Sequence, residues 1–126
     1  ELPAAKDPLT QKAHTEAVAD RGRERRVRRG QVEFDARLDL HGYTHDAARS
    51  ALNAFLLHHR TQNVRCVLVI TGKGKAGEGV IRRHFFDWLN EDDIRVHVSS
   101  FAQAHQKHGG SGAFYVFLRA LHRGGC

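Results

Sequence analysis

The sequence predicts an α/β protein, in the form of an α+β two-layer sandwich with two helices on one face of a mixed four-stranded sheet. Apolar and polar residues alternate strictly from Val32 to Leu40, which is typical of a half-buried strand. Two later stretches, 44–60 and 79–90, carry apolar residues at helical spacing. With the strand patterns that follow each stretch, the order is βαβαββ, which favours two packed layers.

The first helix is predicted to begin next to Thr44. Gly42 ends the preceding strand, and the Thr44 side chain can accept a hydrogen bond from a backbone N–H of the first helical turn. Asp46 is well placed near the positive end of the helix dipole. The stretch from Val32 to about Arg60 is therefore expected to be a β-turn-α unit.

The remaining elements are predicted around a central strand at 66–70. This stretch, CVLVI, is apolar on both faces, as expected of a strand that is buried within a sheet. The helix at 79–90 follows, then a third strand from 94 to 99 and a fourth from 113 to 121. Right-handed crossovers make the first three strands parallel, and the short last connection makes the fourth antiparallel. The carboxyl ends of the first three strands should then meet at one edge, where open α/β sheets bind ligands.

The composition indicates one basic domain. The chain has 126 residues, and Lys plus Arg outnumber Asp plus Glu by 20 to 14, which gives a net charge of +6 and attracts polyanions. No apolar run approaches a membrane span or a signal peptide, so no membrane partner is expected. Two cysteines do not make a disulfide framework, which favours a reducing, cytoplasmic location. A chain that begins at Glu1 and contains no Met is expected to be a processed product or a fragment.

The chain is predicted to have three parts. Residues 1–20 are expected to form a mobile tail, 21–36 an arginine-rich arm and lead-in, and 37–126 the folded domain. The stretch 21–29 contains six Arg and one Glu. Such a run is either a solvated charged helix or an arm that contacts nucleic acid. Under the second interpretation, the arm residues that contact phosphates are Arg25, Arg26, Arg28 and Arg29.

The first strand delivers the sequence LDLHG at 38–42. Asp39 and His41 are two positions apart on a strand, so their side chains should point to the same face. A carboxylate next to an imidazole can hold its tautomer and raise its basicity. His41 is therefore the candidate general base and Asp39 its orienting group. The alternative is a structural Asp and a solvent-exposed His, because D-x-H alone is a weak motif.

The second strand delivers TGKGKAGEG at 71–79. The stretch 72–77 satisfies the G-x-G-x-x-G pattern, but no acidic residue stands about 20 positions further on to hold a ribose, which argues against a dinucleotide. A P-loop fails because Glu78 follows the last glycine instead of Lys. Backbone amides at a helix N-terminus, with Lys73 and Lys75, can still hold a phosphate. A flexible glycine loop is the alternative.

The third connection carries HGGSG at 108–112, where glycines allow close backbone approach by a ligand and His108 stands at the edge. An ordinary chain reversal is the alternative. Ten histidines suggest metal binding, yet no zinc-type spacing is present. A hydrated Mg²⁺ or Mn²⁺ held by Asp39 and substrate phosphates stays open, since such sites use few protein ligands.

The ordered set LDLHG, TGKG and HGGSGA resembles the Smr (small MutS-related) domain family over residues 36 to about 120, and the arginine-rich lead-in resembles the stand-alone bacterial members. The resemblance implies a βαβαββ sandwich similar to the C-terminal domain of a bacterial translation initiation factor. It also implies nicking of DNA or cleavage of RNA, including messenger RNA on stalled ribosomes. The residues of this chain that match the family motifs are Asp39, His41, Thr71, Gly72, Gly74, Gly109, Gly110, Gly112 and Ala113.

The resulting hypothesis is an endonuclease of low sequence specificity that acts on DNA or RNA. His41 is the general base, His108 the acid that protonates a leaving oxygen, and the glycine loops with Lys73 bind phosphate. The competing hypothesis is a non-catalytic module that binds nucleic acid or the ribosome. A dinucleotide-binding enzyme is a third and weaker interpretation.

Overall fold

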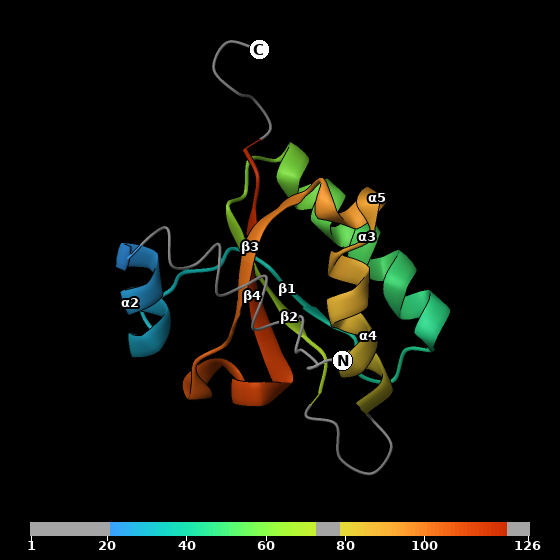
Figure 1. Ribbon diagram of the computed structural model, residues 1–126, viewed down its shortest axis with the longest axis horizontal. Helices are drawn as coiled ribbons and strands as arrows, with labels where there is room; N and C mark the ends of the chain where they lie inside the picture. The colour runs from blue at the N-terminus through green and yellow to red at the C-terminus, as the bar shows by residue number, and fades with distance from the viewer. Residues whose placement is uncertain (1–20, 73–78, 121–126) are drawn as a thin grey trace.

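The computed structural model describes residues 21–72 and 79–120. Its centre is a mixed four-stranded sheet in the order β1-β2-β4-β3, formed by Arg37–Asp39, Cys66–Ile70, Ala113–Leu118 and Val98–Gln103 in that order. Strands β1 and β2 are parallel, and β4 is antiparallel to both of its neighbours, β2 and β3. Strands β1, β2 and β3 therefore run in the same direction, as predicted, and β4 is inserted between the last two (Figure 1).

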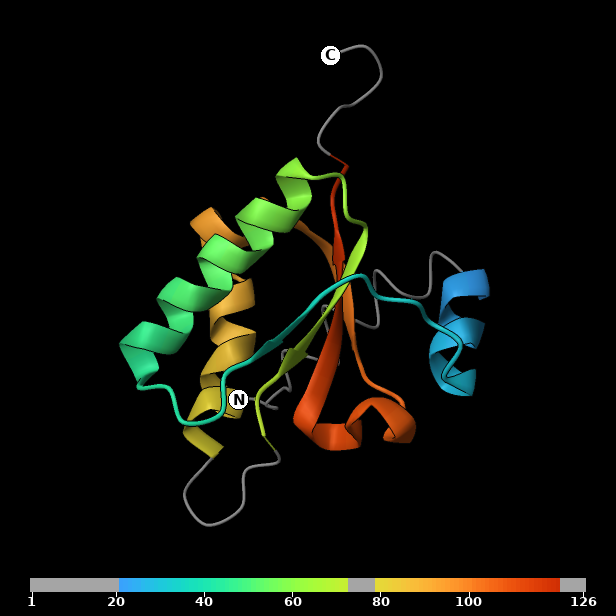
Figure 2. The same ribbon diagram turned by 180° about the vertical axis from the view of Figure 1, so that it is seen from behind.

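The helices lie on both sides of this sheet (Figure 2). The two predicted helices are α3 (His45–Thr61) and α4 (Gly79–Leu89), and they cover one face together with the short α5 (Asp92–Arg95). On the other face lies α2 (Arg21–Arg29), the arginine-rich stretch. We call these the helix face and the open face.

The main hydrophobic core fills the helix face. It forms because alternate residues of the strands point toward α3 and α4, whose apolar stripes cover them. Complete burial of a large apolar side chain stabilises the fold by about 1.5–3 kcal/mol. The fully buried members include Leu40, Leu52, Leu56, Val67, Val69, Phe85, Phe114 and Val116.

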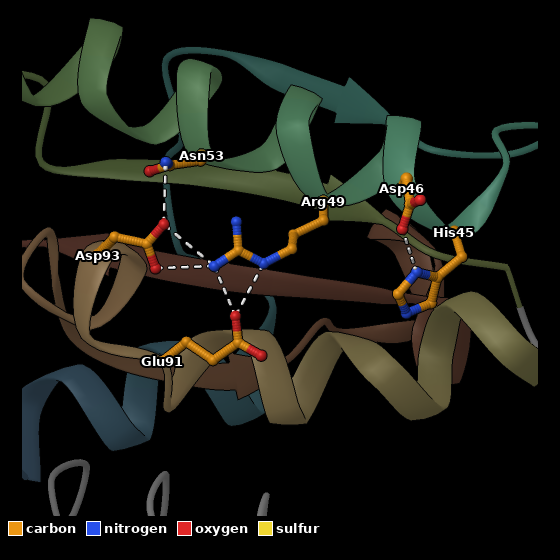
Figure 3. A network of polar contacts seen from close by, with 6 residues as sticks. All are labelled: His45, Asp46, Arg49, Asn53, Glu91 and Asp93. Atoms are coloured by element: carbon orange, nitrogen blue, oxygen red, sulfur yellow. Dashed lines mark hydrogen bonds and ion pairs between the residues drawn. The ribbon is translucent and has the colours of Figure 1, made fainter.

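Helix α3 begins as the sequence predicts. The Thr44 hydroxyl accepts a hydrogen bond from the backbone N–H of Ala47 at 3.2 Å, and Asp46 lies in the first turn. Arg49, one turn further on, joins α3 to the α5 region (Figure 3). Its guanidinium donates to the carboxylates of Glu91 and Asp93, each at 2.8 Å. This exposed network connects α3 to α5 at the rim of the helix face.

The first strand is shorter than predicted. The alternating stretch from Val32 bends at Asp35, and only Arg37–Asp39 is a strand. Val32 and Phe34 pack on the open face, whereas Ala36, Leu38 and Leu40 pack on the helix face. Apolar and polar residues do alternate in the structure. Because of the bend, the apolar residues before Asp35 pack on the open face and those after it pack on the helix face.

The third strand was predicted at the wrong position. Residues 92–95 form α5, and β3 begins at Val98. Val96 is 51% exposed and His97 only 7%, which is the reverse of the predicted alternation. Asp92 and Asp93 favour this turn because acidic side chains stabilise a helix N-terminus. The fourth strand also ends earlier than predicted, at Leu118.

Two short 3₁₀ helices, η2 (Gln106–His108) and η3 (Gly110–Gly112), occupy the connection that was expected to be a loop. Within residues 21–72 and 79–120, no helix has the length and apolar character that crossing a bilayer requires.

Candidate functional site

The three motif-bearing connections come together at one edge of the sheet. Strand β1 ends at Asp39, β2 at Ile70 and β3 at Gln103, and β4 begins at Ala113 directly after the glycine-rich turn. Figure 1 shows the connection that leads to α3, the end of β2 and the two 3₁₀ helices on the same side of the molecule. The topology thus brings these connections to the edge at which the sequence predicted them.

Asp39 and His41 are both exposed at this edge. The Asp39 carboxylate accepts a hydrogen bond from the backbone N–H of His41 at 2.9 Å, and so it fixes the turn that carries the histidine. In the described part of the chain, the His41 imidazole forms no hydrogen bond. Asp39 therefore positions His41 through the backbone, whereas the sequence suggested direct contact with the imidazole.

A cavity of about 430 Å³ opens on the open face beside this pair, and we call it the edge hollow. Asp39 is the register partner of Ile70, which lines the hollow, and paired residues of neighbouring strands point to the same face. The hollow thus lies on the face to which Asp39 points. Its lining residues are Phe34, Arg37, Leu68, Ile70, Gly72, Lys107, His108, Gly109 and Gly112.

Arg37 is a member of the hollow that the motifs did not indicate. It precedes Asp39 by two positions in the same strand, so it shares the open face with it. The sequence could have indicated Arg37, because the period of two that places Asp39 and His41 on one face also places Arg37 on that face. Arg37 and Lys107 give the hollow positive charge suited to a phosphate.

The hydroxyl of Tyr115 contacts the imidazole of His108 and fixes its position. The Tyr115 hydroxyl lies 2.6 Å from His108 Nδ1 and also accepts a hydrogen bond from the backbone N–H of His105 at 3.1 Å. Since the hydroxyl already accepts from His105, its own proton is best used as a donor to His108 Nδ1. That arrangement leaves the proton of a neutral His108 on Nε2. Phe34 packs edge-on against the imidazole, with ring centroids 5.0 Å apart.

His108 is therefore best described as a neutral donor. Burial lowers the pKa of His108, and the charges of Lys107 and His105 lower it further. Burial also raises the pKa of Tyr115, which keeps its hydroxyl protonated and able to donate. At neutral pH this geometry presents an imidazole N–H to the hollow.

Thr71 connects two of the loops. Its side chain is 3% exposed, and its hydroxyl lies within hydrogen-bonding distance of the carbonyls of Gly72 at 3.0 Å and Gly112 at 3.4 Å. The backbone N–H groups of Thr71 and Gly72 also donate to the Gly112 carbonyl, at 2.9 and 3.1 Å. Arg82 of α4 adds a hydrogen bond to the Ser111 carbonyl at 2.9 Å. The Thr71 hydroxyl thus faces the protein backbone and joins the TGKG motif to the GGSG turn.

The glycines of the turn differ in their surroundings. Gly109 has φ +124°, and a Cβ there would lie 2.8 Å from the Ala113 Cβ, so the position requires glycine. Gly110 has φ +57° with open space around it, and Gly112 is buried. The predicted phosphate contacts Lys73, Gly74 and Lys75 lie outside the described residues.

The arginine-rich arm is not part of this edge. Arg25, Arg26, Arg28 and Arg29 are exposed on α2, the helix that lies on the open face. Among the described residues, none of these four forms an ion pair. Arg26 lines a second cavity on the open face. In residues 21–72 and 79–120, no three His, Cys, Asp or Glu side chains gather closely enough to hold a metal ion.

Comparison with known proteins places this architecture in a family. The Smr domain family model matches residues 38–119. Ribosome rescue factor SmrB of Tolumonas auensis is 34% identical over 94 residues, and SmrB of Klebsiella pneumoniae is 31% identical over the same length. Each alignment covers 75% of this chain, which spans about half the length of these curated relatives (51% and 48%).

Two solved structures share the fold. YdaL, a stand-alone small MutS-related protein from Escherichia coli, is 32% identical with a TM-score of 0.63, and the match covers 76% of this chain and 73% of that one. The Smr domain of Thermus thermophilus MutS2 is 29% identical with a TM-score of 0.59, and the match covers 68% of this chain and 99% of that one. The chain therefore belongs to the Smr domain family.

Proposed function

We propose that this chain is an endonuclease that cleaves the phosphodiester backbone of RNA or DNA with low sequence specificity. The observation that carries the proposal is the convergence of His41, with its backbone fixed by Asp39, and the cationic edge hollow at one edge of the sheet. A general base, a phosphate site and open access for a long substrate are the minimum that such a reaction requires.

His41 is the proposed general base. Its imidazole is exposed and open to a substrate, and the Asp39 carboxylate fixes the turn that carries it by accepting a hydrogen bond from the His41 backbone N–H. With RNA, the proton comes from a 2′-OH, whose oxygen then attacks the adjacent phosphorus and displaces the 5′-oxygen. The displaced oxygen takes a proton from water, and His41 returns its proton to the solvent. The products of this route are a 2′,3′-cyclic phosphate and a 5′-OH end.

His108 is proposed to stabilise the reacting phosphate. A neutral Nε2–H, held in position by Tyr115, can donate to a phosphate oxygen as negative charge builds up. The sequence alone suggested that His108 acts as the acid for the leaving oxygen, which requires a protonated ring. The lowered pKa of His108 favours the role of donor. Arg37 and Lys107 supply the accompanying positive charge.

The deciding experiment measures cleavage of matched, end-labelled single-stranded and double-stranded RNA and DNA. His41→Ala should lower the cleavage rate by about 10²–10⁴-fold, the usual contribution of a general base, while leaving substrate affinity unchanged. His58→Ala is the matched control, because His58 is an exposed histidine in the last turn of α3. Equal loss of cleavage in both variants would exclude His41 as the base.

The metal question is settled in the same assay. Cutting of RNA that survives EDTA and leaves cyclic phosphate ends supports the route through the 2′-OH. Cutting that EDTA abolishes, with 5′-phosphate ends, assigns Asp39 to a hydrated Mg²⁺ or Mn²⁺ instead of the turn that carries His41. DNA has no 2′-OH, so nicking of DNA also requires a route other than the first.

A second candidate function is a binding module for the ribosome or its RNA. The names of the SmrB relatives, which are ribosome rescue factors, and the exposed Arg25, Arg26, Arg28 and Arg29 of α2 favour it. Intact Asp39 and His41 at the edge favour the enzyme. Tight binding to ribosomes without cleavage of any of the four substrates would support the module.

A further inference from the structure

A second cavity lies on the open face, and we call it the arginine hollow. It has a volume of about 330 Å³, which is the size of a small-ligand site. Helix α2 contributes to it, and so do the lead-in to β1, the start of β2 and the end of β4. The lining residues are Arg23, Arg26, Gln31, Val32, Glu33, Arg65, Cys66 and Phe117.

The charge of this hollow is positive. Its lining includes three arginines and one carboxylate, that of Glu33. Arg23 is anchored, since its guanidinium lies 4.1 Å from the centre of the Phe117 ring and donates to the Ser100 hydroxyl at 3.1 Å. Arg26 and Arg65 are exposed, and within residues 21–72 and 79–120 neither forms an ion pair. Two arginines from distant parts of the sequence thus present their charge to one cavity.

The thiol in this hollow is inert. Cys66 is buried, and burial raises the pKa of its thiol to about 12. A thiol that stays protonated is a poor nucleophile and a poor metal ligand, so the hollow is suited to binding and not to thiol chemistry.

The two hollows lie on the same face and share the same strand. Cys66 lines the arginine hollow, and Leu68 and Ile70 line the edge hollow. A strand rises about 3.3 Å per residue, so the two cavities are roughly 7–13 Å apart along β2. The lead-in passes between them, with Val32 in one and Phe34 in the other. Neighbouring nucleotides of one extended strand can span this separation.

We propose that the arginine hollow binds a backbone phosphate of a single-stranded nucleic acid whose cleaved phosphate lies in the edge hollow. This inference rests on the proposed function, because the edge hollow is the proposed place of cleavage. A single strand fits better than a duplex, since the hollow is walled by α2 and the lead-in and has a volume of only about 330 Å³. Phosphate contacts of this kind raise affinity without reading the base sequence.

The test measures binding of fluorescently labelled single-stranded oligo(dT) to the full chain at several salt concentrations. For single strands, the slope of log K against log salt changes by about 0.7 for each phosphate contact. The double variant Arg26→Ala/Arg65→Ala should bind a ten-nucleotide strand about tenfold more weakly and lose about 0.7 from this slope. Its affinity for a dinucleotide should stay the same, because the single internal phosphate of a dinucleotide cannot occupy both hollows and is expected in the edge hollow.

Two controls make the result specific. Arg95→Ala removes an exposed arginine from α5 on the helix face, and it should leave both the affinity and the slope unchanged. The variant Arg26→Lys/Arg65→Lys keeps both charges and should restore most of the slope. If the double alanine variant binds like Arg95→Ala, the arginine hollow is not a phosphate site.

The readout separates this inference from the proposed function. Loss of affinity and slope in the double variant supports the hollow even if the wild type cleaves no substrate, in which case the endonuclease proposal fails alone. Cleavage by the wild type with unchanged binding in the double variant overturns the hollow alone. Tight binding of an acidic peptide in place of oligo(dT), reduced in the double variant, also overturns it in favour of a protein partner.

Discussion

The two faces of the sheet are built from alternate residues of the same strands, yet they differ in kind. The helix face buries a continuous cluster of aliphatic and aromatic side chains beneath α3 and α4. The open face has a smaller cluster that includes Tyr115 and Cys66, and it carries both hollows. Since residues i and i+1 of a strand point to opposite faces, one sequence can specify a core on one side and a binding surface on the other.

This difference separates stability from chemistry. Most of the fully buried volume lies on the helix face, so substitutions there should unfold the chain. On the open face, the Tyr115 hydroxyl and the Arg23 guanidinium make polar contacts close to the hollows. Substitutions there should change function more than stability. Three experiments on the faces test this separation, in order of decreasing effect.

The largest effect is expected from Phe85→Ala on the helix face. Phe85 is fully buried and stacks on Phe114 with ring centroids 5.0 Å apart. Removing a buried phenyl ring leaves a cavity and destabilises a protein by about 3–5 kcal/mol. Urea unfolding followed by circular dichroism should show this loss.

The control for Phe85→Ala is Leu57→Ala, since Leu57 is 49% exposed on α3. Surface substitutions of this kind change stability by about 0.5 kcal/mol or less. If Phe85→Ala does not fold, Phe85→Leu gives a smaller loss that can still be compared. Similar unfolding midpoints for the Phe85 and Leu57 variants would show that the helix face does not hold most of the stability.

A smaller loss of stability with a specific change at the site is expected from Tyr115→Phe. The variant removes the hydroxyl that accepts from the His105 N–H and contacts His108 Nδ1. An unsatisfied backbone N–H destabilises the fold by about 1–3 kcal/mol. The pKa of His108 should rise, because the neutral imidazole loses the donor that stabilises it. A titration followed by NMR measures this shift directly.

The control for Tyr115→Phe is Tyr43→Phe, which removes a hydroxyl from a tyrosine that is 41% exposed. It should leave both the stability and the pKa of His108 unchanged. A His108 that titrates identically in the wild type and in Tyr115→Phe would contradict the tautomer assigned here, and His108 would return to the role of acid.

The sequence predicted the fold wherever a pattern had only one interpretation. The run 66–70 is apolar on both faces, and 44–60 has a cap and a stripe, so both were located correctly. The prediction of a strand over 94–97 was wrong, because two patterns fit this stretch equally well. Ile94 and Val96 have the spacing of a strand, and Ile94 and His97 have that of a helix. The helix start signal, Asp92 and Asp93, stands directly before this stretch. The bend at Asp35 could not be predicted, since alternation does not state which face each half will cover.

The sequence predicted which residues meet at one edge of the sheet, because their motifs stand at strand ends. Asp39, His41 and His108 lie at the predicted edge because the topology follows from the element order. No sequence motif indicated Arg65 or Tyr115. Arg65 lines a cavity with residues of α2 and β4, and Tyr115 contacts His108, so both roles depend on tertiary structure. The inward hydroxyl of Thr71 is also a tertiary feature, because its partner Gly112 lies 41 positions away.

The smallest effect is expected at the rim of the helix face, from Arg49→Met. Hydrogen bonds from Arg49 lower the pKa of Asp93, so the folded state favours the charged carboxylate. A lowered folded-state pKa contributes stability above the ordinary aspartate range, and this contribution is lost as the pH falls through the lowered value. The loss caused by Arg49→Met should thus be greatest at neutral pH and should shrink in acid.

Urea midpoints at neutral pH and at a pH below the pKa of Asp93 measure this difference. Arg49→Lys is the control, because it keeps the charge but cannot donate to Glu91 and Asp93 with the same planar geometry. High salt should reduce the effect, since the carboxylates are exposed and screened. A loss that stays the same in acid and in high salt would assign the role of Arg49 to packing of its methylene groups between α3 and α5, and the rim would then behave like the core beneath it.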